Sequence, residues 1–63
     1  MKFVIILLLS ITGIEEIKLN IKGSRCETIA ESWREVNTEY QGPGPNQGNF
    51  TNDGKLMIGY RCQ

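Results

Sequence analysis

The sequence FTNDGKLMIGYRC, residues 50–62, predicts a β-hairpin that ends in a cysteine. After the turn the residues alternate, so a strand would place one apolar set on its inner face. That inner set is Leu56, Ile58, Tyr60 and Cys62. The outward set is Met57, Gly59 and Arg61. A three-residue turn over 52–54, with Gly54 in the left-handed conformation, pairs Phe50 with Leu56 and adds Phe50 to the apolar face.

A disulfide is expected between Cys62 and the other cysteine of the chain, Cys26. A chain of 63 residues buries too little apolar surface to be comfortably stable without a cross-link, a metal or a partner. On the chain-entropy model a bridge that closes a loop of this size contributes about 4 kcal/mol. The alternative is two reduced thiols in a cytosolic protein; the Cys-x-x-Cys spacing of a redox motif is missing.

The amino-terminal residues predict a secretory signal. Lys2 is followed by the uninterrupted apolar run Phe3–Leu9, which is too short to span a bilayer. Cleavage after Gly13 is expected, which makes residues 1–13 the signal peptide. Cleavage after Gly23, or later trimming of residues 14–25 as a pro-segment, is also open. In the opposing interpretation Phe3–Leu9 is a buried strand of a cytosolic protein.

Residues 14–25 contain a strand pattern, because Ile17, Leu19 and Ile21 alternate with polar residues before Gly23. From Cys26 the period becomes helical. One stripe holds Ile29, Trp33, Val36 and Tyr40, and the opposite side holds Glu27, Glu31, Glu35 and Glu39. The acidic stripe is interpreted as a solvated face, with docking of a basic partner as the alternative. Glycines and prolines in 41–48 predict an exposed loop that ends the helix.

The predicted fold is small α+β: one amphipathic helix on a two- or three-stranded antiparallel sheet, closed by the Cys26–Cys62 disulfide. Residues 26–63 form the disulfide-closed helix and hairpin, and residues 14–25 add a third strand if they survive processing. The expected core joins the helix stripe to the apolar face of the hairpin. Its members are Ile29, Trp33, Val36, Tyr40, Phe50, Leu56, Ile58 and Tyr60.

Composition excludes several functions. Seven basic and seven acidic residues give no net charge, which argues against nucleic-acid binding and against membrane lysis or insertion by the mature chain. Without histidine, imidazole-based catalytic triads and mixed cysteine-histidine zinc sites are excluded. No nucleophile has a recognisable base, so we expect no enzyme, no catalytic residue, no cofactor and no metal.

Two functions remain after these exclusions. The first is a secreted, monomeric, disulfide-stabilised peptide that binds an extracellular protein, in the manner of a toxin, an immune effector or a signalling ligand. Its binding-surface candidates are Pro43, Pro45, Met57 and Arg61. Asn49 begins an Asn-Phe-Thr sequon and is the glycosylation candidate. The second is a small cytosolic or oligomeric interaction protein that retains its apolar amino terminus.

Overall fold

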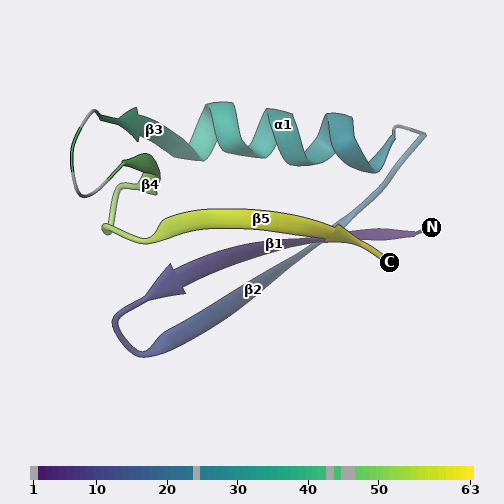
Figure 1. Ribbon diagram of the computed structural model, residues 1–63. Helices are drawn as coiled ribbons and strands as arrows, with labels where there is room; N and C mark the ends of the chain where they lie inside the picture. The colour runs from purple at the N-terminus through teal and green to yellow at the C-terminus, as the bar shows by residue number, and fades with distance from the viewer. Residues whose placement is uncertain (1, 24, 43, 45–46) are drawn as a thin grey trace.

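A single antiparallel sheet and one helix make up the computed structural model, which describes residues 2–23, 25–42, 44 and 47–63. The elements in chain order are β1 (Phe3–Ser10), β2 (Gly13–Asn20), α1 (Cys26–Asn37), β3 (Thr38–Gln41), β4 (Gly48–Thr51) and β5 (Leu56–Cys62) (Figure 1). The five strands lie in the order β2-β1-β5-β4-β3. The α+β prediction is confirmed, but the expected sheet of two or three strands was too small.

The central strand is β1, the segment with the signal-like pattern. It pairs with β2 on one side, where Ser10 lies opposite Gly13, and with β5 on the other, where Val4 lies opposite Cys62. A strand inside a sheet with both faces covered can be apolar at every position. Accordingly Ile6, which faces the helix, has 0% exposure, and Ile5 on the opposite face has only 4%.

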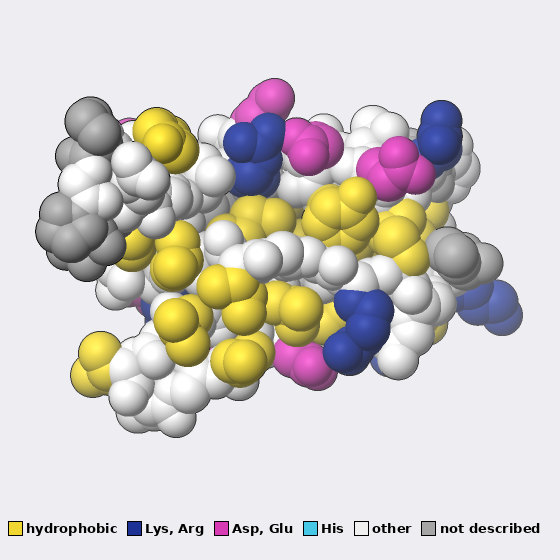
Figure 2. All heavy atoms as spheres, in the orientation of Figure 1, with side chains coloured by type: hydrophobic (Ala, Val, Ile, Leu, Met, Phe, Trp, Pro, Cys, Tyr) yellow, Lys and Arg dark blue, Asp and Glu magenta, His cyan; other side chains and the backbone are white. Residues whose placement is uncertain are grey.

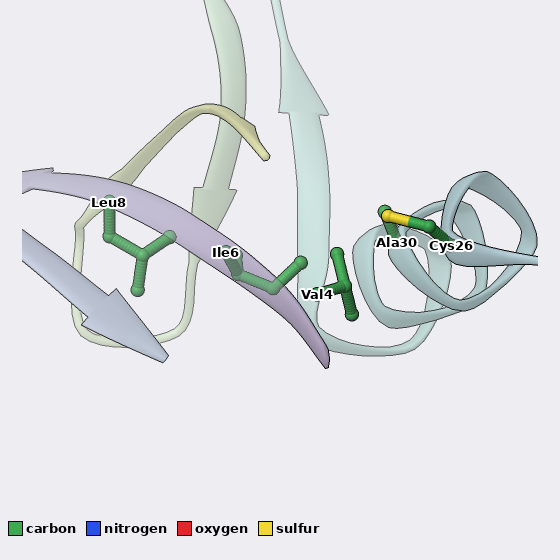
Figure 3. Packing of buried hydrophobic residues seen from close by; sticks show 5 residues of the cluster. All are labelled: Val4, Ile6, Leu8, Cys26 and Ala30. Atoms are coloured by element: carbon green, nitrogen blue, oxygen red, sulfur yellow. The ribbon is translucent and has the colours of Figure 1, made fainter. Parts of the chain in front are cut away.

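The core lies between α1 and the β1–β2–β5 part of the sheet. Figure 3 shows its five buried members, which are Val4, Ile6, Leu8, Cys26 and Ala30. Three of the five come from β1. Partly buried apolar side chains surround them, among them Ile17, Leu19, Ile21, Ile29 and Trp33. The predicted inner face of residues 17–21 is therefore confirmed.

The helix is shorter than its apolar stripe suggested. It ends at Asn37, whose side-chain amide donates to the Trp33 carbonyl, and the Thr38 hydroxyl donates to the Arg34 carbonyl. The Thr38 N–H also donates to the Arg34 carbonyl as the last helical bond, but the Thr38 backbone is already extended, with φ −132° and ψ 158°, so the chain continues directly into β3. Tyr40 is consequently a strand residue with 67% exposure, and the expectation that Tyr40 and Val36 are core residues was wrong.

The turn between β4 and β5 has the predicted register. Phe50 pairs with Leu56, and Gly54 has a φ of 83°, within the left-handed region. The alternation of inward and outward side chains along β5 is broken, however, by a β-bulge. Leu7 and Leu8 of β1 pair with Gly59 and Met57, so Ile58 is an extra residue without a partner in β1. This bulge turns Met57 toward the core, where an outward side chain was expected.

The disulfide between Cys26 and Cys62 is present, with the two Cα atoms 6.0 Å apart. It ties the first residue of α1 to the last residue of β5 and confirms the predicted pairing. Among the described residues, no helix combines the length and hydropathy required to cross a membrane.

Candidate binding surface on the outer edge of β5

The outer edge of β5 has backbone groups that the sheet does not use. Phe3 and Gln63 exchange two hydrogen bonds, at 2.9 and 2.8 Å. In an antiparallel ladder such pairs recur at every second residue, so Arg61 and Gly59 also direct their N–H and C=O groups toward β1. The backbone groups of Tyr60 and Cys62 then point to the other side of β5.

No strand covers most of this outer edge within the described residues. β4 and β5 form one residue pair, Phe50 with Leu56, and β4 then diverges from β5. Residues 58–62, hereafter the β5 edge, therefore present strand-shaped backbone without a ladder partner among the described residues. An unpaired edge of this kind is a template for pairing with another chain.

Apolar side chains flank the β5 edge. Ile58 has 46% and Tyr60 38% of its surface exposed. Figure 2 shows one band of hydrophobic side chains between β5 and α1, and a second band on the side of β5 away from the helix. The signal for this surface was Gly59, because a glycine inside a strand often marks a bulge or a close backbone approach. Alternation alone had assigned Ile58 and Tyr60 to the core.

Charged residues of α1 line the upper side of the hydrophobic band. Glu27, Glu31 and Arg34 each follow a core-facing residue by one position, so helical geometry places all three on the same flank. Figure 2 shows charged side chains of the helix above the band, on the side where β5 lies. We call this flank, with Glu27, Glu31 and Arg34, the helix rim. Glu31 is paired with Arg34.

On the face away from the helix, long charged side chains cover β1. Ile5 lies between its cross-strand neighbours Lys18 and Arg61. The Lys18 Nζ atom lies 4.1 Å from the centre of the Phe3 ring, and Arg61 Nη2 lies 3.2 Å from Glu16 Oε2. The aliphatic stems of Lys18 and Arg61 can shield Ile5 while their charges stay in water.

One hollow, of about 270 Å³, is lined by a cluster of charged side chains. Lys55 Nζ lies 2.8 Å from Glu15 Oε1 and 3.3 Å from Asp53 Oδ2, with Trp33 also in the lining. The hydrogen bond with Glu15 raises the pKa of Lys55, and the same bond lowers the pKa of Glu15. A hydrogen bond from Thr51 lowers the pKa of Asp53. Each charge has a partner, so the cluster connects the β1–β2 and β4–β5 turns.

Another hollow, of about 300 Å³, lies at the end of the sheet beside the same turns. Its apolar lining comes from Leu9, Ile11, Phe50 and Leu56. It is open to solvent on one side, and Ile11 is fully exposed there. This hollow offers apolar contact without a charged group to orient a ligand, so its chemistry is less specific than that of the β5 edge.

The predicted site residues do not form one group. Pro43 and Pro45 lie outside the described residues. Met57 is partly buried against the core, whereas Arg61 is exposed beside the β5 edge and paired with Glu16. Asn49 is half-buried in β4, opposite Tyr40, and its glycosylation stays a prediction.

No protein-family model, curated protein or solved structure matches this chain. Within the part of the chain that the structure describes, no three histidine, cysteine, aspartate or glutamate side chains group as metal ligands do. The function must therefore be argued from the surface itself.

Proposed function

We propose that this chain is a small disulfide-stabilised binding protein of the extracellular space, and that it engages another protein through the β5 edge. The observation that carries the proposal is the combination of outward backbone groups at Tyr60 and Cys62 with apolar side chains on both sides. Main-chain hydrogen bonds give affinity in such strand additions, and flanking side chains give specificity.

The proposed protein keeps residues 3–10. A chain that began at Ile14 would lack Val4, Ile6 and Leu8, three of the five core residues, and β5 would lose its main neighbour. This supports retention of the apolar segment over its removal as a signal peptide. The cytosolic alternative also retains the segment, but the Cys26–Cys62 bond favours an oxidising compartment.

The first test is the intact mass of the protein from its native source, before and after reduction. The proposal expects a species that contains residues 3–10 and gains two hydrogen atoms on reduction. A species that begins at residue 14 would overturn the retained-strand form of the proposal, and free thiols would overturn the extracellular assignment.

The second test locates the binding surface. A photoreactive phenylalanine analogue replaces Ile58 in the full-length oxidised chain, which is then irradiated in extracellular fluid from its source. The matched control carries the same analogue in place of Val36, which is 82% exposed on the opposite flank of the helix. A discrete cross-linked product from position 58 alone is expected. Equal products from both positions, or none from position 58, would refute binding at the β5 edge.

A further inference from the structure

We infer that two copies of this chain associate through the free edge of β2, as a symmetric antiparallel pair of β2 strands centred on Ile17. This edge is on the other side of β1 from the β5 edge, so the association goes beyond the proposed function, and either can fail alone. It follows from the direction of the β2 backbone groups and from the order of charges along the strand. A dimer of this kind departs from the monomer expected from the sequence.

The outer edge of β2 has unpaired backbone groups. β2 is the terminal strand of the sheet, so no strand of the described residues covers its outer side. The Ile21 N–H donates to the Lys2 carbonyl at 3.0 Å. In an antiparallel ladder such pairs recur at every second residue, so Ile17 also directs its N–H and C=O groups toward β1. The residues between these positions direct theirs outward, and they are Ile14, Glu16, Lys18 and Asn20.

The charges on this edge select one register for a second copy. Outward backbone groups must meet outward groups, so even-numbered residues of one copy have to lie opposite even-numbered residues of the other. With Ile17 on the two-fold axis, Glu16 of each copy lies directly opposite Lys18 of the other copy. The next permitted register in either direction places Glu16 opposite itself or Lys18 opposite itself. Like charges directly opposite one another are destabilising, so β2 is complementary to itself when Ile17 is on the axis.

Both charged side chains are available for this pairing. Glu16 and Lys18 are exposed on the face of the sheet away from the helix. Among the described residues Lys18 forms no ion pair, and its ammonium lies over the Phe3 ring. Glu16 is paired with Arg61, but its side chain is 53% exposed, and a carboxylate can accept hydrogen bonds from more than one cation. Glu16 of a second copy therefore supplies the counter-charge that Lys18 lacks.

Apolar side chains meet across the same seam on the helix face. Ile17 is partly buried against the core and would lie opposite Ile17 of the other copy, with Leu19 at the next position on that face. α1 packs mainly on β1 and β5, which leaves the outer side of β2 open. One strand pair should bury less than the roughly 1,200 Å² of a stable interface, so we expect a weak dimer that depends on protein concentration.

The β5 edge stays accessible in such a dimer. β1 lies between β2 and β5, so the seam joins the two sheets on the far side of β1 from both β5 edges. The dimer would therefore present two identical copies of the surface to which we assign binding. A partner with two sites would bind the dimer more tightly than the monomer, because its second contact is intramolecular.

The first test follows the full-length oxidised protein by sedimentation velocity and by amide hydrogen exchange, from about 10 µM to about 1 mM. The mass should rise toward that of a dimer and not pass it. Exchange at Glu16 and Lys18 should slow as the dimer forms, whereas the Ile17 amide, which faces β1, should be protected at every concentration. A monomer throughout, growth beyond a dimer, or slowed exchange at Tyr60 in place of Glu16 and Lys18 would overturn the inference.

The second test exchanges charges across the seam. Glu16→Lys and Lys18→Glu each replace the opposite-charge pairs by like-charge pairs, so each variant alone should self-associate about tenfold or more weakly than the parent. A mixture of the two variants has opposite charges at every such pair and should form a heterodimer. The matched mixture of Lys22→Glu with Glu39→Lys has the same net charges outside the seam, and each of its members should self-associate as the parent does.

A double variant, Glu16→Gln with Lys18→Gln, removes both charges without creating like-charge pairs. It should weaken association about twofold to fivefold, the range for exposed charge contacts, and it keeps the test decisive if a single variant fails to fold. Folded single variants that do not pair in the mixture would refute the register, as would equal losses in the Lys22 and Glu39 variants. A partner cross-linked from position 58 would leave the proposed function standing whichever result is obtained for β2.

Discussion

Replacing Ile6 by alanine tests most directly whether residues 3–10 form the core of the protein. Ile6 is fully buried in β1, at 0% exposure. The change removes three buried carbons, at about 0.8 kcal/mol each. A residual cavity brings the expected loss to about 3–4 kcal/mol. At 63 residues the whole domain should have about 3–9 kcal/mol of stability, so the loss is a large part of the total.

The assay is urea unfolding of the full-length oxidised chain. With an m-value of about 1 kcal/mol/M, Ile6→Ala should lower the midpoint by about 3 M or leave the chain unfolded in water. Ile14→Ala is the matched control, because it makes the same chemical change at a position with 62% exposure in β2. The control should stay within about 0.5 kcal/mol of the parent. Equal losses in the two variants would refute the assignment of β1 to the core.

Three further changes test the cross-link, the charge cluster and the turn. Replacement of both Cys26 and Cys62 by serine should cost about 4 kcal/mol in the same assay, since the bridged residues are 36 positions apart. The hydrogen bond with Lys55 holds the pKa of Glu15 below its usual value of 4.5. The contribution of Glu15 to stability is therefore complete above pH 4.5 and is lost as pH falls through the lowered pKa, and Lys55→Met should reduce this acid dependence. Gly54→Ala should cost about 1–2 kcal/mol, because its φ of 83° disfavours a side chain.

Each of these three predictions has an outcome that would contradict it. A double-serine chain with unchanged midpoint would show that the disulfide does not restrict the unfolded state. For the charge cluster, the urea midpoint is measured as the pH is lowered. If it falls as steeply in Lys55→Met as in the parent, the ion pair between Glu15 and Lys55 is not the cause of the loss of stability in acid. A Gly54→Ala variant with the same urea midpoint as the parent would show that the turn has another conformation.

Local sequence rules predicted correctly those elements whose local preference is the same as the structure that the rest of the fold requires. The three-residue turn over 52–54 was predicted because it buries Phe50 with Leu56, and the structure contains that pair. The alternation of Ile17, Leu19 and Ile21 was also sufficient, because β2 is an edge strand with one apolar face. The disulfide followed from there being only two cysteines.

The errors arose where the tertiary context changes the local preference. The stripe through Val36 and Tyr40 is helical in period, but the backbone becomes extended at Thr38 and the chain continues as β3. Ala30 was overlooked because a small residue adds little to an apolar pattern. It is nevertheless 1% exposed and belongs to the core cluster.

The same apolar run, Phe3–Leu9, has two physical interpretations because a signal sequence and a strand buried on both faces require the same composition. The remainder of the chain supports the buried strand, which is the form of the protein that we propose. β2 presents Ile17 and Leu19 to the core, β5 presents Cys62, and β1 lies between these two strands. Without β1, these residues would lose their shared neighbour.

The candidate binding surface could not be predicted from side-chain patterns because it depends on which backbone groups stay unpaired. That depends on where β4 diverges from β5, just beyond the Phe50–Leu56 pair, and on the bulge at Ile58. The bulge interrupts the alternation of β5, and the divergence exposes its outer edge, so two irregularities of one hairpin together create the surface that we assign to binding.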